Sequence, residues 1–252
     1  MTVNLREVVS YMDNYLRVAE VPDYPQAFNG LQVENPGSVS RILAAVDACQ
    51  SSIDAAVVVG ADLVLVHHGL FWGGLEPITG RNWKRLGELI RKDIALYSSH
   101  LPLDCHEEVG NSALLAKQLG VSQTGRFAQY EGTAIGVMGE LNLELNELSE
   151  RLEELLGTSP TVIATGPRQV KRVGVVTGGG GPSIGEAAAA GLDTLITGEG
   201  SHHTYFDAEE LGINIIYAGH YATETFGVKA LAARVADKFG LEWEFFDHPT
   251  GL

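Results

Sequence analysis

The sequence predicts an α/β protein built from two similar halves, each containing a β-α-β unit, with a small α+β insert between them. Short apolar runs of strand length alternate with helical patterns, which is typical of parallel strands joined by crossover helices. The order of these elements returns 131 positions later in the chain. A composition of 45% hydrophobic residues with 30 glycines and 9 prolines is ordinary for a soluble protein of this class.

The first half is predicted to open with an amphipathic helix and to continue into a β-α-β unit. Apolar residues recur there at three- and four-residue steps and mark one helical face: Leu5, Val8, Val9, Met12 and Leu16. Residues 41–46 form an apolar run of strand length, residues 51–59 are predicted as a helix, and residues 62–66 as a second strand. This order implies two parallel strands with a right-handed crossover.

The second half repeats this unit, with strands predicted at 172–177 and 194–197 and a helix at 183–190. Five identities are spaced by 131 positions: Arg41 and Arg172, Ser52 and Ser183, Ile53 and Ile184, Gly60 and Gly191, Asp62 and Asp193. A later segment matches at a spacing of 120: Tyr97 and Tyr217, His100 and His220, Asp104 and Glu224. We interpret these matches as an internal duplication. The alternative is that β-α-β units resemble one another without common ancestry.

The piece between the halves differs in pattern from both. Residues 133–139 alternate like a half-exposed strand, residues 145–156 form a Glu- and Leu-rich helix, and residues 161–164 form another strand. We therefore expect a first half over residues 1–126, an α+β insert over 127–168, and a second half over 169–252.

Charge and composition narrow the function classes. The net charge of −15 argues against a nucleic-acid groove, because phosphate neutralisation needs clustered Lys and Arg. A nucleotide substrate stays compatible, since a bound divalent metal can supply positive charge. The two cysteines provide no disulfide framework. The N-terminus lacks an apolar signal core, and no apolar run reaches the roughly 18 residues of a membrane span. We expect a cytoplasmic protein.

Two types of histidine motif indicate a metal site. His67 and His68 end a predicted strand, where open α/β sheets place their ligands. The alternative places one imidazole in the core and the other in solvent, because neighbouring strand residues point to opposite faces. His220 and Glu224 share a face if a helix begins near His220.

His100 and Asp104 have the same spacing as His220 and Glu224, although Pro102 favours a loop there. Taken singly, each pair suggests an ordinary polar contact. Together with the duplication, the set suggests a centre for two divalent metals, with zinc, manganese, iron or nickel as candidates. Its five predicted ligands are His67, His68, Asp104, His220 and Glu224.

Further groups are candidates for supporting roles. His100 is a sixth ligand candidate or a proton carrier, and Glu199 is a second candidate for proton transfer. His202 and His203 either line the cleft or lie on the surface. The glycines at 178–181 either form a structural turn or cradle a phosphate, and Ser183 with Glu186 has the spacing of a capping box.

These motifs resemble the GTP cyclohydrolase I type 2 family, also called the Nif-three-like family. The resemblance rests on three motifs: His67-His68-Gly69, Ser99-His100-Leu101-Pro102-Leu103-Asp104 followed by Gly110-Asn111, and Ile196-Thr197-Gly198-Glu199 leading to Gly219-His220-Tyr221-Ala222-Thr223-Glu224. It covers nearly the full chain. The chain departs from the family in Gly69-Leu70-Phe71-Trp72, where a proline after the histidine pair is common in relatives.

The resemblance implies a dinuclear metal centre held by the five residues named above, and in many members a ring-shaped homohexamer. The family name implies opening of the guanine imidazole ring of GTP, with release of formate. The sequence shows no set of residues that would select guanine and no obvious Lys/Arg cluster that would bind a triphosphate. Two alternatives stay open: a metal-dependent hydrolase of another nucleotide or phosphoester, and a non-catalytic metal-binding adaptor.

Overall fold

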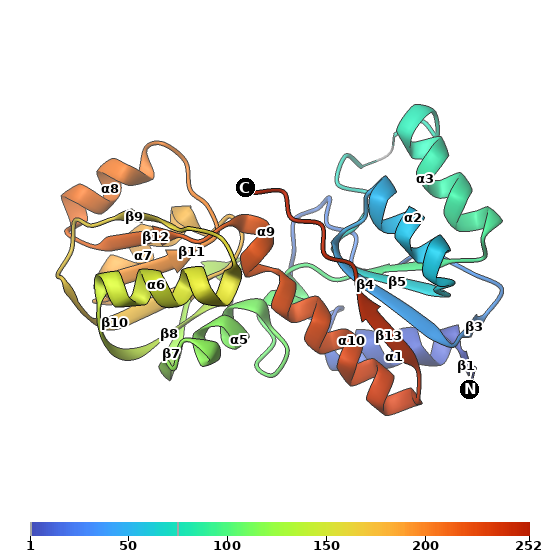
Figure 1. The fold of residues 1–252 in the computed structure, drawn as a ribbon, viewed down its shortest axis with the longest axis horizontal. Helices are drawn as coiled ribbons and strands as arrows, with labels where there is room; N and C mark the ends of the chain where they lie inside the picture. The colour runs from blue at the N-terminus through green and yellow to red at the C-terminus, as the bar shows by residue number, and fades with distance from the viewer. Residues whose placement is uncertain (1, 75) are drawn as a thin grey trace. The chain divides into compact units, whose positions relative to one another are not determined.

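A computed structural model describes residues 2–74 and 76–252, which form two compact units (Figure 1). Unit 1 comprises the chain up to Leu103 together with Gly227–His248, and unit 2 comprises Asp104–Phe226 together with Pro249–Leu252. Each unit contains one mixed β-sheet of five or six strands. No helix in the described part of the chain is long and apolar enough to cross a membrane.

Unit 1 is built on a sheet with the strand order β13-β4-β5-β6-β2, in which only β2 is antiparallel to its neighbour. A separate antiparallel pair, β1 and β3, lies near the N-terminus of the unit. The strands are β1 (Val3–Asn4), β2 (Gly30–Val33), β3 (Ser38–Val39), β4 (Arg41–Asp47), β5 (Leu63–His68), β6 (Ala95–Ser98) and β13 (Glu242–Phe245).

Helices cover this sheet because both of its faces are apolar. Ile53 of one helix and Leu89 of another pack with Leu43 and Val64 in a single buried cluster. Ala44 and Leu65, which alternate with those strand residues, are also fully buried. The helices are α1 (Leu5–Tyr15), α2 (Gln50–Val59), α3 (Gly80–Arg91), α4 (Leu101–Asp104), whose last residue begins unit 2, and α10 (Thr225–Phe239), which joins unit 1 at Gly227. Figure 1 shows α2 beside α3.

Unit 2 has the strand order β7-β8-β10-β11-β12-β9, with the parallel strands β10, β11 and β12 in its middle. Antiparallel strands extend it on both sides. The strands are β7 (Ser122–Tyr130), β8 (Thr133–Glu144), β9 (Thr161–Ile163), β10 (Gln169–Val176), β11 (Thr194–Thr197) and β12 (Asn214–Tyr217).

Two helix pairs cover the two faces of the unit 2 sheet. Leu115 and Leu148 pack with Ile196 in one buried cluster, whereas Ile184 packs with Leu195 in another. The adjacent residues Leu195 and Ile196 therefore point to opposite faces, as the period of a strand requires. The helices are α5 (Asn111–Gln118), α6 (Leu145–Leu156), α7 (Ile184–Ala189), α8 (Thr204–Leu211) and α9 (His220–Thr223), with a 3₁₀ turn η1 (Gly181–Ser183) before α7.

The duplicated β-α-β units make the same polar contacts. In unit 1, Oδ2 of Asp62 accepts from the backbone N–H of Ser40 and of Arg41. In unit 2, Oδ2 of Asp193 accepts from the backbone N–H groups at positions 171 and 172, which are 131 residues further on. Arg41 donates to the Val59 carbonyl and Arg172 to the Ala190 carbonyl, again with this spacing. These shared contacts extend the sequence match to the local structure.

The spacing of 120 positions expected for the later segment is wrong by one residue. Leu63 of β5 pairs with Ala95, and its counterpart Thr194 of β11 pairs with Asn214, so the third strands are 119 residues apart. α4 and α9 likewise begin 119 residues apart, at Leu101 and His220. The counterpart of His220 is therefore Leu101, although identical side chains favoured His100. A shift of one residue changes the face to which a strand residue points.

The expected insert over residues 127–168 does not form a sheet of its own. Its strand β8 pairs with β10, and β9 pairs with β12, so the segment completes the unit 2 sheet. The units change at Leu103 and Phe226, whereas boundaries were expected at residues 126 and 168. Local patterns identified the strands of this segment, but strand pairing decided which sheet they join.

Replacement of Asp62 by Ala is expected to lower the free energy of unfolding by about 1–3 kcal/mol, because it removes a charged acceptor from two backbone N–H groups and from the Ser40 hydroxyl. Asp54→Ala is the matched control, since this exposed carboxylate accepts only from Gln50 among the hydrogen bonds of the described residues. Urea denaturation followed by circular dichroism measures both. Equal stability of the two variants would contradict the assigned role.

Candidate metal centre

Three histidines of unit 1 meet at one edge of its sheet. His67 and His68 end β5, and His100 follows the neighbouring parallel strand β6 and precedes α4. The carboxyl ends of parallel strands lie at the same edge, so paired strands bring these residues together. Each histidine offers a ring nitrogen within 4.8 Å of those offered by the other two, which is the spacing of a metal site.

Hydrogen bonds fix the orientation of all three rings through Nδ1. This atom lies 2.9 Å from the Ser99 carbonyl oxygen in His67, 2.9 Å from Asp47 Oδ1 in His68 and 2.8 Å from Asp23 Oδ1 in His100. An oxygen acceptor at Nδ1 selects the tautomer protonated there, whose lone pair is on Nε2. Histidines that bind metals are held by acceptors of this kind.

The two adjacent histidines are not divided between core and solvent. Their ring centroids are 4.6 Å apart and the ring planes are inclined by 47°. His67 is fully buried, and the side chain of His68 is 19% exposed beneath the ring of Trp72. The twist at the end of β5 therefore lets both rings contribute to one group, as the two-histidine motif predicted.

Asp23 holds His100 by more than one contact. Its carboxylate also accepts from the Asn29 side chain and from the backbone N–H of Leu101. Burial alone would raise the pKa of Asp23, but the hydrogen bond and charge of His100, with these other donors, keep it below the ordinary value. Asp23 is thus ionised at neutral pH and can anchor the imidazole.

In unit 2, two buried carboxylates approach each other. Asp104 and Glu224 are 7% and 2% exposed, and they offer oxygens within 4.8 Å of each other. Asp104 Oδ1 accepts from Asn111 Nδ2 at 2.8 Å, and the Thr177 hydroxyl lies at 3.5 Å. Two neighbouring anions in a buried site repel each other unless a cation or a proton compensates them.

His220 lies between two carboxylates of the same unit. Its Nδ1 is 2.8 Å from Glu199 Oε1, and its Nε2 is 3.2 Å from Glu224 Oε2. Burial alone would lower the pKa of His220. The hydrogen bonds and charges of Glu224 and, to a smaller extent, of Glu199 raise this pKa to about 9. The structure therefore brings together His220, Glu224 and Glu199. A metal that took the Nε2 lone pair would displace this proton.

Gly178 allows Glu224 to take its position. A Cβ at Gly178 would lie 2.0 Å from Glu224 Oε1, and its φ of +63° belongs to the left-handed region that favours glycine. The role of Gly178 is thus steric.

Whether residues 178–181 bind phosphate stays a prediction. The expected capping box is wrong, because Ser183 makes no cap hydrogen bond and Glu186 accepts from the Gln129 backbone.

The remaining expectations have mixed outcomes. Pro102 lies at the second position of α4, so the loop expected there is wrong; proline is tolerated in a first helical turn. His202 and His203 are both exposed, which favours the surface alternative. Gly69 permits a close approach, since a Cβ there would overlap the Gln32 side chain.

Sequence reasoning missed Asp23 and Asp47, the two carboxylates that hold His100 and His68. Asp47 ends β4 and pairs with His68 across the ladder, so its place at a strand end was a usable signal. Asp23 lies 77 residues before His100 in an irregular segment, and no local pattern connects the two.

Residues 3–250 match the family described as Duf34/NIF3 (NGG1p interacting factor 3). The chain belongs to this family. It is 46% identical over 248 residues to the "GTP cyclohydrolase 1 type 2 homolog" of Deinococcus radiodurans, covering 98% of this chain and 94% of that one. It is 45% identical to the protein of the same name from Pyrococcus abyssi, covering 98% of both.

Solved structures agree with the fold. TTHA1606 from Thermus thermophilus is 42% identical, with a TM-score of 0.90 over 99% of this chain and all of that one. The protein ybgI, whose title states an unknown function, is 39% identical, with a TM-score of 0.93 over 99% of this chain and all of the other. The NIF3 family and an α/β fold with two mixed sheets are thus established for this chain.

The donor groups fit divalent metal ions. Unit 1 offers three oriented imidazoles, and unit 2 offers two buried carboxylates and a further imidazole. Nitrogen and oxygen donors without a thiolate suit zinc, manganese, iron or nickel. The sequence-predicted ligands therefore form two groups, one in each unit, and His100 is placed as favourably for coordination as His67 and His68.

Gly178→Ala is expected to lower the metal content of the protein severalfold without unfolding it, because the new Cβ would displace the Glu224 carboxylate. Gly179→Ala is the matched control, since no atom lies within 4 Å of a Cβ at that position. Elemental analysis after reconstitution measures the metal, and circular dichroism verifies the fold. Equal metal content in both variants would exclude this role of Gly178.

Proposed function

We propose that this protein is a dinuclear metal-dependent hydrolase that acts on GTP or a related nucleotide. Two divalent ions would be held by His67, His68, Asp104, His220 and Glu224, with His100 and Glu199 assisting. The observation that carries the proposal is the buried set of oriented donors: three imidazoles fixed through Nδ1, and two carboxylates with oxygens within 4.8 Å of each other. Such a set is costly to bury without cations.

The protein's own residues supply positioning and proton transfer. When bound, two divalent ions would lower the pKa of water and so provide hydroxide at neutral pH. Asp23 and Asp47 hold the imidazoles of His100 and His68 in one orientation. Glu199 is about half exposed and contacts His220 Nδ1, so it can exchange a proton with solvent or substrate.

The choice of substrate is supported by the relatives. Curated proteins 45–46% identical to this chain along nearly its full length carry the name "GTP cyclohydrolase 1 type 2 homolog". Opening of the guanine imidazole ring requires water to attack an electron-poor carbon, and the proposed centre suits that chemistry. We also propose a cytoplasmic homohexamer, on the family resemblance, which native mass spectrometry would test.

The metal-loaded protein is expected to release formate from GTP, and His220→Ala is expected to reduce this rate at least a hundredfold, since it removes a ligand held by two carboxylates. His202→Ala is the control, because this histidine is exposed in the turn that precedes α8 and lies outside the ligand groups of the described residues. Formate is measured enzymatically.

Metal analysis accompanies the assay and separates its outcomes. About two metals per chain with intact GTP after long incubation would refute the GTP activity and favour another substrate, which a screen of nucleotides and phosphoesters would identify. Fewer than about one metal per chain after reconstitution would refute the dinuclear centre itself. Removal of metal by a chelator is expected to abolish turnover, and return of the ion to restore it.

A further inference from the structure

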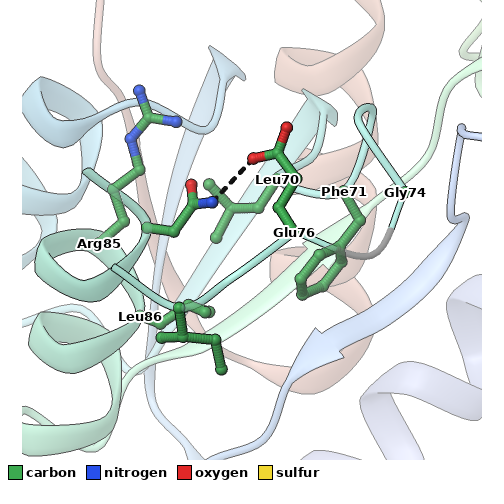
Figure 2. A pocket seen from close by; sticks show the side chains of 8 residues that line it. Leu70, Phe71, Gly74, Glu76, Arg85 and Leu86 are labelled. Carbon is green, nitrogen blue, oxygen red and sulfur yellow. Dashed lines mark hydrogen bonds between the residues drawn. The ribbon is translucent and has the colours of Figure 1, made fainter. Parts of the chain in front are cut away.

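A small pocket lies in unit 1, between the loop that follows the two histidines of β5 and helix α3 (Figure 2). Its volume is about 190 Å³, below the roughly 300–1,000 Å³ of pockets that enclose drug-sized ligands. The pocket thus suits one ring system better than a whole nucleotide. Leu70, Phe71 and Leu86 give it apolar walls, and Glu76, Asn82 and Arg85 add polar groups.

The polar groups offer both acceptors and donors. Asn82 Nδ2 donates to Glu76 Oε2 at 2.8 Å, as the dashed line in Figure 2 shows, and this contact orients the carboxylate. A carboxylate can accept several hydrogen bonds, so Glu76 retains acceptor capacity. Arg85 supplies a guanidinium, and its buried Nε has no hydrogen-bond partner among the described residues.

The helix that forms one wall is positively charged. Arg81, Lys84 and Arg85 lie within about one turn of α3, and Arg91 and Lys92 follow at its end. Five of the 17 Lys and Arg residues of a chain with a net charge of −15 therefore lie in twelve positions. Of these five residues, Arg85 lines the pocket and Arg91 pairs with Glu88, and the excess of positive charge on this helix would favour a ligand that carries phosphate.

The pocket adjoins the histidine group through the chain. Leu70 follows His68 by two residues, which places their Cα atoms no more than about 7.6 Å apart. Trp72 of the same loop contacts the rings of both His68 and His100, with centroid distances of 5.8 and 4.9 Å. One loop thus lines the pocket with Phe71 and the histidine group with Trp72.

We propose that this pocket binds the guanine base of a nucleotide substrate, an inference that rests on the proposed hydrolase function. Guanine presents acceptors at O6 and N7, which match a guanidinium, and N–H donors at N1 and N2, which match a carboxylate. Phe71 provides an aromatic face for stacking. Adenine fits less well, because its N1 acceptor would face the Glu76 carboxylate.

Isothermal titration of the metal-loaded full chain with guanosine and with adenosine tests this proposal. The native protein is expected to bind guanosine at least about tenfold more tightly than adenosine. Glu76→Gln is expected to weaken guanosine binding about tenfold or more, because it removes a charged acceptor, and to leave adenosine binding nearly unchanged. Glu210→Gln, the same change on the exposed surface of α8, is the control and is expected to bind as the native protein does.

The outcomes separate the pocket from the reaction. Guanosine binding that is equal in the Glu76→Gln and Glu210→Gln variants would overturn the proposal, even if GTP releases formate. Preferential guanosine binding that depends on Glu76 would support it, even if GTP is not hydrolysed. Arg85→Gln provides a second variant should Glu76→Gln fail to fold. It is expected to weaken guanosine binding to a similar extent, and unchanged binding there would equally overturn the proposal.

Discussion

Parallel pairing of β5 with β6 is the constraint on which the candidate centre depends. It aligns the carboxyl ends of two strands that are separated by a long connection, and so places His100 beside His67 and His68. The same edge receives Asp47 from β4, because β4 pairs with β5 on the other side. A mixed sheet covered by helices is rigid, and a rigid edge can hold several imidazoles close together without relaxation.

Carboxylates give the ligand groups of the two units their chemistry. Asp23 and Asp47 orient the rings of His100 and His68 through hydrogen bonds, and the Ser99 carbonyl orients the ring of His67 in the same way. In unit 2, Asp104 and Glu224 are buried close together, and His220 forms an ion pair with Glu224. Both arrangements cost free energy in an empty site and stabilise a bound cation. This relation between burial and charge connects the fold to the proposed hydrolysis.

The duplication explains the architecture better than it explains the ligands. Asp62 and Asp193 repeat a structural contact with the same spacing in both units. The ligands do not repeat, since Leu101 is the counterpart of His220, and Gly198 and Glu199 are the counterparts of His67 and His68. The two halves share their strand and turn contacts, which stability requires, and differ at the strand ends, where ligands bind.

The sequence by itself determined the central β-α-β units and most of the residue types of the site. Hydrophobic periodicity located α6 at Leu145–Leu156 and both β-α-β units. The position of His67 and His68 at the end of a predicted strand marked them as candidate ligands. Only the tertiary structure decided that residues 127–168 complete the unit 2 sheet, that Asp23 holds His100, and that α3 lines a pocket with Phe71. Local patterns reflect the backbone period, whereas pairing and packing join residues far apart in the chain, and no local pattern encodes those partners.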